Sequence, residues 1–322
     1  MRSDVPPRFP SRRAVLVGGG AALALSAGGC AMIPSPSQIE AQNPPVGSFV
    51  EADGLRIHYV EMGPPDAIPV VLVHGATGNL NDMTFDLAPR LADRFRVIAF
   101  DRPGLGWSQR PEKEGWRPAV QTAILRVAAA RLGVERPVVV GHSWGGAVAT
   151  AWALQDPTIR GAAILAGASM PWSAGDDWLA PLKTSSAAAW VGASVFRLMA
   201  DGDGGASAAA RIFRPQPVPE GYLAHLQPEL LLRPETFRNN TEDIQRLDGA
   251  LARQSQGYPQ MVPPLEILHG EADRIVSPQI HSAALAQVVP HARLELLPGV
   301  GHMLHHVDPG RVTAAVERLA AK

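Results

Sequence analysis

Short, continuous runs of apolar residues recur along the chain between positions 70 and 297. A run without polar alternation predicts a strand covered on both faces, as in a parallel sheet with helices on either side. The runs are Val70–Val73, Val97–Phe100, Val138–Val140, Ala162–Leu165, Leu265–Leu268 and Leu294–Leu297. Upstream of them, Asp53-Gly54 separates Phe49–Ala52 from Leu55–Glu61 and predicts a two-residue hairpin turn. We therefore expect eight strands, the first two of them antiparallel.

Stretches with helical character lie between several of these predicted strands. They are Val120–Leu132, Ala147–Leu154 and Pro278–Val288. Near the C-terminus, Asp308-Pro309 combines a helix N-cap residue with proline at the first helical position. Strands that alternate with helices predict parallel strands joined by crossover helices, which is an α/β fold.

The interval from residue 170 to 261 lacks a comparable buried strand. It carries helix-like stretches, several prolines and the large side chains of Trp172, Trp178, Trp190, Phe196 and Phe213. We interpret it as an inserted, mainly helical cap between two parts of a core, 47–169 and 262–322. Within the cap, the glycine-rich residues 201–205 are expected to form a flexible joint.

The first thirty residues have the pattern of an export signal. Residues 1–13 contain Arg2, Arg8, Arg12 and Arg13 against a single acidic residue, and residues 14–29 are uncharged. This uncharged run is shorter than the roughly 20 residues that a membrane-spanning helix needs. The paired arginines within Ser11–Leu16 resemble a twin-arginine signal, and an ordinary secretory signal is the alternative.

Cys30 is the only cysteine, which excludes an intramolecular disulfide. It follows Ala27-Gly28-Gly29, so residues 1–30 resemble a bacterial lipoprotein signal, although Ala27 stands where such signals usually have leucine. We expect an exported protein that is either free in the periplasm or anchored to the membrane by a lipid on Cys30. Residues 31–46 contain prolines among Ser, Gln and Asn, and they are expected to form an extended linker.

Composition narrows the classes of function. The 322 residues are 46% hydrophobic and 18% charged, which is enough apolar material for a large core. The formal net charge of −1 argues against a general affinity for nucleic acid, so the expected partner is a small-molecule substrate. The sequence has no zinc-type spacing of Cys and His and no Gly-x-Gly-x-x-Gly after a strand, so neither a metal nor an organic cofactor is expected.

The stretch Val138–Gly146 carries the clearest chemistry. A predicted buried strand runs into Gly141-His142-Ser143-Trp144-Gly145 and then into an alanine-rich helix. A nucleophilic serine on a tight strand-to-helix turn needs small neighbours, because the backbone there is strained and crowded. Gly141 and Gly145 supply that room. The helix N-terminus also favours the negative charge that develops during attack.

With these residues the chain resembles the α/β-hydrolase superfamily over about residues 49–321. Val71-Leu72-Val73-His74-Gly75 is similar to the start of the family's oxyanion loop, and Asp101–Ser108 is similar to the loop after the next strand. The family places its acid after the seventh strand and its histidine after the eighth. The segments Leu268–Val276 and Pro298–His302 match those positions, so the resemblance implies a triad of Ser143, Asp273 and His302.

The roles of these residues follow from general chemistry. Ser143 needs His302 to accept its proton, and Asp273 would orient the imidazole and stabilise its cation. The backbone N–H groups of Trp144 and Ala76 are the expected oxyanion donors, with Thr77 or Gly78 as alternatives to Ala76.

Other residues compete for these roles. Glu271 is an alternative acid, two residues before Asp273. His74, His142 and His269 are expected to be structural, and His305 and His306 are expected to lie beyond the catalytic loop.

A serine nucleophile favours hydrolysis of a small carboxylic ester through an acyl-serine. Relatives with an aspartate nucleophile, such as epoxide hydrolases and haloalkane dehalogenases, form an alkyl ester that Ser143 cannot form in the same way. Hydrolysis of a carbon–carbon bond in a diketone and hydrolysis of an amide or peptide remain alternatives, because they use similar triads. A non-catalytic binding protein of the same fold is the alternative from a different functional class.

Overall fold

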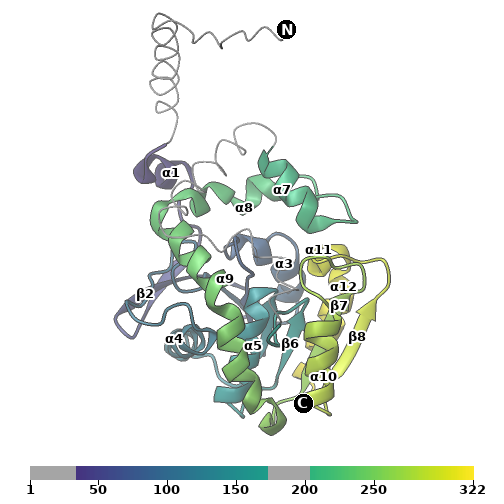
Figure 1. Cartoon of the computed structure of the whole chain (residues 1–322). Coiled ribbons are helices and arrows are strands. Elements are labelled where there is room, and N and C mark those ends of the chain that lie inside the picture. Colours follow the sequence, from purple (N-terminus) through teal and green to yellow (C-terminus); the bar gives the residue numbers. More distant parts are fainter. Residues whose placement is uncertain (1–33, 173–203) are drawn as a thin grey trace, which may run out of the picture.

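A single eight-stranded sheet forms the centre of the molecule (Figure 1). The computed structural model describes residues 34–172 and 204–322. The strands are β1 (Ser48–Ala52), β2 (Leu55–Met62), β3 (Pro69–Val73), β4 (Arg96–Phe100), β5 (Val138–His142), β6 (Gly161–Leu165), β7 (Leu265–Gly270) and β8 (Arg293–Leu297). Their order in the sheet is β1-β2-β4-β3-β5-β6-β7-β8.

The strand directions confirm the predicted α/β-hydrolase sheet. β1 pairs antiparallel with β2, and β2 pairs antiparallel with β4. All other pairings are parallel, from β4 through β3, β5, β6 and β7 to β8. Parallel neighbours need crossover connections, and the helices of the chain supply them.

Helices cover both faces of this sheet. The main core helices are α3 (Leu87–Ala92), α4 (Pro118–Arg131), α5 (Trp144–Gln155), α10 (Ala284–Val288) and α12 (Pro309–Ala320). Successive residues of β3 point to opposite sides: Val71 and Val73 pack in the core with α4 and α5, while Val70 and Leu72 pack in the core with α3 and α12. This two-sided burial is why the central strands are continuously apolar in sequence.

Shorter helices complete the core. They are α2 (Asn81–Thr84), the π-helical turn η6 (Gln279–Ala283) and α11 (Leu304–Val307). Asp308 caps α12 through a side chain that accepts a hydrogen bond from the N–H of Arg311, with Pro309 in the first turn, as predicted.

The described part of the segment between β6 and β7 is helical. It consists of α7 (Gly204–Phe213), α8 (Tyr222–Leu226), η4 (Pro228–Leu232), α9 (Pro234–Gln254) and η5 (Ser255–Gln260). Figure 1 shows α7 and α8 above α3 and α11, while the long α9 passes along the side of the core. The structure does not describe three of the large side chains predicted for the cap, those of Trp178, Trp190 and Phe196. The first part of the predicted glycine-rich joint also lies outside the described residues. Its last two residues, Gly204 and Gly205, begin α7.

The linker is not extended throughout, contrary to the prediction for residues 31–46. A short helix, α1 (Pro36–Gln42), begins at an N-cap formed by Ser35. The Ser35 side chain accepts from the N–H of Gln38, and the Gln38 side chain accepts from the N–H of Ser35, which is a capping box. Ile39 is buried, so the helix has an apolar anchor.

None of the helices within residues 34–172 and 204–322 is long and apolar enough to cross a membrane.

Candidate active site

Four loops that follow parallel strands meet at one edge of the sheet. They follow β3, β5, β7 and β8, and they carry the predicted oxyanion loop, Ser143, Asp273 and His302 respectively. The strand order reverses between β4 and β5, which lie on opposite sides of β3. Such a reversal at the carboxyl ends of parallel strands opens a crevice in which α/β proteins bind their ligands.

Ser143 occupies a strained turn between β5 and α5. Its backbone has φ 54° and ψ −119°, a conformation that a residue with a side chain rarely adopts. The neighbouring glycines permit the turn, since a Cβ on Gly141 would overlap the backbone of Gly145, and a Cβ on Gly145 would overlap the Val73 carbonyl oxygen. The sequence prediction of a crowded strand-to-helix turn is confirmed. Ser143 is partly exposed, and its hydroxyl makes no hydrogen bond to a described residue.

His302 and Asp273 form a buried pair. The Nδ1 of His302 lies 2.7 Å from Oδ2 of Asp273. The other carboxylate oxygen of Asp273 accepts from the backbone N–H groups of Ile275, at 2.7 Å, and Val276, at 3.0 Å. Nδ1 of His302 must donate to the carboxylate, so Nε2 is the ring nitrogen left to accept a proton.

His269 is a partner of Asp273 that sequence reasoning assigned only a general structural role. Its Nε2 lies 3.0 Å from Asp273 Oδ2, and its Nδ1 lies 2.5 Å from the Ser282 hydroxyl. Burial alone would raise the pKa of Asp273, but the charge of His302 and the hydrogen bonds from His269 and His302 hold the pKa below its usual value. Glu271, the alternative acid, is exposed, so the structure places Asp273 and not Glu271 against His302.

The loop after β3 packs directly on the nucleophile. A Cβ on Gly75 would lie 3.0 Å from Cβ of Ser143, so this loop can approach only because Gly75 has no side chain. The N–H of Thr77 donates to Oδ1 of Asn240 at 2.7 Å and is therefore not free for an oxyanion. The neighbouring N–H of Ala76 has no such partner among the described hydrogen bonds, which favours Ala76 over Thr77.

Trp144 begins α5, where backbone N–H groups have no acceptor within the helix. Its N–H is therefore available beside Ser143. The indole ring of Trp144 is fixed by a 3.2 Å hydrogen bond from Nε1 to the Asp243 carbonyl. The guanidinium of Arg102 stacks on the same ring, with Cζ 4.0 Å from the ring centroid.

Arg102 was not predicted as a site residue, yet it supports the oxyanion loop from behind. It is fully buried and donates to the carbonyls of His74, at 3.1 Å, and Gly75, at 3.2 Å. It also pairs with Asp243 of α9 at 2.8 Å. A guanidinium that holds two successive carbonyls fixes the direction of the N–H groups that follow them.

His74 is fixed in one tautomer. The N–H of Arg102 donates to its Nε2 at 3.0 Å, so Nδ1 carries the proton and donates to the Gly75 carbonyl at 2.8 Å. Burial and the charge of Arg102 lower the pKa of His74 to about 4. The hydrogen bonds agree with the predicted structural role in the loop.

The cap contacts the His302 loop on its other side. The Gln216 side chain accepts from the N–H of Gly301 at 3.0 Å and donates to the Gly299 carbonyl at 2.7 Å. Met303 is buried in an apolar cluster with Phe213, Tyr222 and Leu226. The cap therefore helps to hold the loop that carries His302.

His142 connects the nucleophile turn to the same loop. Its Nε2 donates to the His302 carbonyl at 3.2 Å, and its ring centroid lies 4.8 Å from that of His302. Burial, followed by the charges of His305 and His302, lowers the pKa of His142 well below its usual value. The elbow and the His302 loop are thus direct neighbours, as a Ser–His pair requires.

The chain is similar to known hydrolases over most of its length. The family model described as "alpha/beta hydrolase fold" matches residues 68–309. Haloalkane dehalogenase 2 of Mycobacterium tuberculosis is 25% identical over 276 residues, covering 81% of this chain and 90% of that protein. Proline iminopeptidase of Xylella fastidiosa is 26% identical over 297 residues, covering 82% of this chain and 92% of that protein.

Solved structures show the same fold. The esterase RhEst1 from a Rhodococcus species superposes with a TM-score of 0.63 at 22% identity, covering 85% of this chain and 98% of that one. Two further relatives match over a shorter stretch. The chain spans only 28% of the length of a dihydrolipoyllysine-residue acetyltransferase component of Cupriavidus necator, matched over 109 residues, and 32% of the length of a soluble epoxide hydrolase of a Corynebacterium species, matched over 97 residues.

Proposed function

Because the chain belongs to the α/β-hydrolase family, we propose that it is a serine hydrolase that cleaves a small carboxylic ester through an acyl-serine intermediate. The observation that carries this proposal is the strained turn at Ser143, which lies beside the oxyanion loop and next to the loop of the His302–Asp273 pair. A serine is held in such a backbone conformation when its hydroxyl must project from a helix N-terminus.

The proposed reaction has two halves. His302 Nε2 takes the proton from Ser143 Oγ as that oxygen attacks the ester carbonyl, and Asp273 stabilises the resulting imidazolium. The N–H groups of Ala76 and Trp144 stabilise the tetrahedral oxyanion. The alcohol then leaves with the proton from His302. Water, activated by the same histidine, releases the acid and restores Ser143.

The relatives are consistent with more than one substrate class. The esterase structure supports ester hydrolysis, whereas the iminopeptidase supports the amide alternative. We do not propose dehalogenation, because it proceeds through an aspartate and this chain has Ser143 at the elbow. Diketone hydrolysis remains a second candidate, since it needs the same triad and oxyanion donors.

The test is Ser143→Ala in a panel of p-nitrophenyl esters, amides and a vinylogous diketone. Turnover should be fastest with an ester of a short or medium acid, and kcat should fall on the order of 10⁴-fold or more without loss of fold. A fluorophosphonate probe should label the wild-type protein at Ser143 and leave the variant unlabelled. Labelling that persists in the variant would assign the nucleophile elsewhere, and exclusive diketone turnover would replace the ester proposal.

A further inference from the structure

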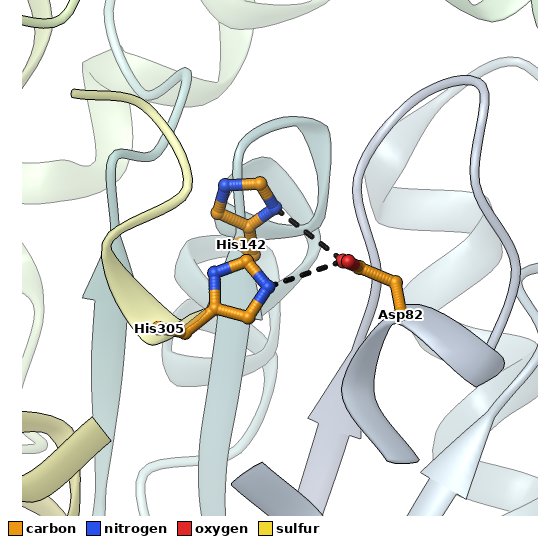
Figure 2. Close-up of side chains that lie close together, drawn as sticks. All are labelled: Asp82, His142 and His305. Atoms are coloured by element: carbon orange, nitrogen blue, oxygen red, sulfur yellow. Dashed lines mark ion pairs between the residues drawn. The ribbon is translucent and has the colours of Figure 1, made fainter. Parts of the chain in front are cut away.

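A cluster of one carboxylate and two imidazoles lies behind the nucleophile turn (Figure 2). Asp82 comes from α2, His142 from the end of β5, and His305 from α11, three residues after His302. All three side chains are buried, with residue exposures of 4%, 3% and 0%. Figure 2 shows both rings directed at the carboxylate of Asp82.

The tautomer of His142 leaves a bare nitrogen that faces this carboxylate. Its Nε2 donates to the His302 carbonyl, which can only accept, so Nε2 carries the proton. Burial keeps an imidazole neutral, and Nδ1 therefore presents a lone pair. That Nδ1 lies 3.8 Å from Oδ2 of Asp82 and has no hydrogen-bond partner. Two electron-rich atoms thus face each other in a buried site, an arrangement that a positive charge between them would stabilise.

His305 repeats the same pattern. Its Nε2 lies 3.3 Å from Oδ2 of Asp82, but it is not aligned as a hydrogen bond, and neither ring nitrogen has a hydrogen-bond partner among the described residues. A native structure rarely leaves buried polar nitrogens without a partner. His142 Nδ1 and His305 Nε2, both without a hydrogen-bond partner, face the same oxygen of Asp82.

The opposite oxygen of Asp82 is already held. Its Oδ1 accepts from the Tyr222 hydroxyl at 2.8 Å and lies 2.9 Å from Nε2 of His306. Metal-binding carboxylates are typically fixed in this way by outer hydrogen bonds to the oxygen that does not bind the ion. Oδ2 is therefore the oxygen left free to act as a ligand.

We propose that Asp82 Oδ2, His142 Nδ1 and His305 Nε2 form a site for a divalent transition-metal ion of the zinc type. Bonds of about 2.0–2.1 Å to a tetrahedral zinc place its ligand atoms about 3.3 Å apart. The Asp82–His305 distance of 3.3 Å has this value, and the three ligand atoms all lie within 4.8 Å of one another. Binding a common ion would require the side chains to rotate, since His142 Nδ1 lies 3.8 Å from Asp82 Oδ2, and two imidazoles with one carboxylate are a ligand set that zinc accepts.

An ion at this position would join three segments whose positions relative to one another determine the geometry of the proposed active site. It would tie α2 to the nucleophile turn through His142 and to the His302 loop through His305. It would also polarise the His142 ring and strengthen the bond from Nε2 to the His302 carbonyl. Its role is therefore to stabilise and position the site, and the ester chemistry does not pass through it.

The experiment measures metal content and ligand geometry in the full-length chain. Because the site is buried, the protein is produced in medium supplemented with Zn²⁺ or Co²⁺ and then washed with a chelator. Wild-type protein should retain about one metal ion per chain by elemental analysis, and the cobalt form should show the visible bands of tetrahedral Co²⁺. Asp82→Asn and His305→Gln should lower the retained metal tenfold or more.

The matched control is His225→Gln, an exposed cap histidine that contacts Thr84 and Phe85 close to the cluster. It should retain metal as the wild type does. His305→Cys should still bind Co²⁺ and add a thiolate-to-cobalt band in the near ultraviolet. Metal-free wild-type protein under both growth conditions, or equal metal content in wild type, Asp82→Asn and His305→Gln, would overturn the site. The cobalt spectrum of the wild type decides the matter even if a variant does not fold.

Discussion

Both carboxylate oxygens of Asp273 help to fix its position beside His302. Oδ1 is held by two backbone N–H groups of its own turn, and Oδ2 is shared between His302 and His269. The carboxylate therefore cannot rotate without losing several hydrogen bonds. This explains how a short loop after β7 can fix the orientation of His302, the proposed base, which lies on the loop after β8.

The first prediction concerns this carboxylate. Asp273→Asn should lower kcat on the order of 10³–10⁴-fold, because an amide no longer selects the tautomer of His302 that accepts the serine proton. Substrate binding should change little. Steady-state kinetics with the preferred ester measures both. Glu271→Gln is the matched control on the same loop, and a larger loss in that variant would show that the acid is misplaced by two residues.

The second prediction concerns acid stability through His74. Its folded-state pKa is about 4, below the value of 6.5 for the free side chain. The stabilisation is therefore complete above pH 6.5 and is lost as pH falls towards 4, since the unfolded chain binds the proton first. The shift corresponds to about 3 kcal/mol in the free energy of unfolding.

Urea denaturation at a series of pH values measures this loss. His74→Asn should lower the pH dependence between 6.5 and 4, whatever its effect on stability at neutral pH. An unchanged slope in the variant would assign the acid sensitivity to other buried groups, such as His281, whose pKa burial also lowers to about 4.

At the scale of elements, α9 has an unusual inner face. Its buried positions are Thr236, Asn239, Asn240, Asp243, Ile244, Leu247, Ala250 and Leu251, so the N-terminal half of that face is polar and the C-terminal half apolar. The polar half bonds to the oxyanion loop through Asn240 and to Arg102 through Asp243. A cap helix thus completes the support of the catalytic loops.

The third prediction tests that support. Asp243 neutralises two guanidinium groups, Arg102 and Arg110, each at 2.8 Å. Asp243→Asn removes the carboxylate that pairs with the buried guanidinium of Arg102, while Arg110 keeps Glu242, and it should reduce the free energy of unfolding by about 3–5 kcal/mol, with a fall in kcat. Denaturant titration followed by tryptophan fluorescence measures the first effect.

Glu242→Gln is the control for this change, because Glu242 is the adjacent residue and also pairs with Arg110. The side chain of Glu242 is 38% exposed, so the loss in the free energy of unfolding should be within about 1 kcal/mol. Equal losses in the free energy of unfolding would show that the buried Arg102–Asp243 pair contributes no more to stability than the pair of Arg110 with the more exposed Glu242.

The elements differ in how far the sequence could predict them. The strands were predicted closely, because strands buried on both faces leave continuous apolar runs such as Val138–Val140. Helix α1 was not predicted, because the prolines of residues 31–46 favour an extended chain, whereas the capping box of Ser35 and Gln38 starts a helix within that segment. The supports of the site were missed for another reason: Arg102 and Asp243, or Asp82 and His305, are far apart in sequence and become partners only through the topology of the sheet.

At the scale of the whole molecule, the fold is a core with its active-site loops on one side and an N-terminal extension. The structure describes that extension only from residue 34 onwards, where α1 is anchored by Ile39 and by a 3.1 Å ion pair between Glu40 and Arg233. We propose that the preceding residues direct export, and that Cys30 is the site at which a lipid would attach. The chain segment between Cys30 and α1 would then hold the folded core close to a membrane surface.

The fourth prediction concerns this location. Replacing Arg12 and Arg13 with lysine should leave precursor in the cytoplasm if the signal is of the twin-arginine type, whereas an ordinary secretory signal tolerates the change. A lipidated protein should sediment with membranes and dissolve only in detergent, because two or more acyl chains hold a protein stably at a bilayer.

Cell fractionation and mass spectrometry of the mature N-terminus distinguish these outcomes. If the protein is lipidated, Cys30→Ser should release it from the membrane or prevent correct processing of its signal. An unmodified N-terminus at or beyond residue 31 would eliminate the lipid anchor, and an intact Met1 would eliminate export.

The polar half of α9 also bears on how this chain can diverge from its relatives. A lid that touched the core through apolar contacts alone could be exchanged as a unit, because such contacts tolerate new partners of similar volume. Here, exchange would remove the acceptor for Thr77 and the counter-charge of Arg102 in one step. We therefore expect new substrate preferences to arise through single substitutions on the inner surface of the cap, or through paired changes at Arg102 and Asp243. Chimeric proteins in which the whole cap is exchanged for that of a relative should be inactive.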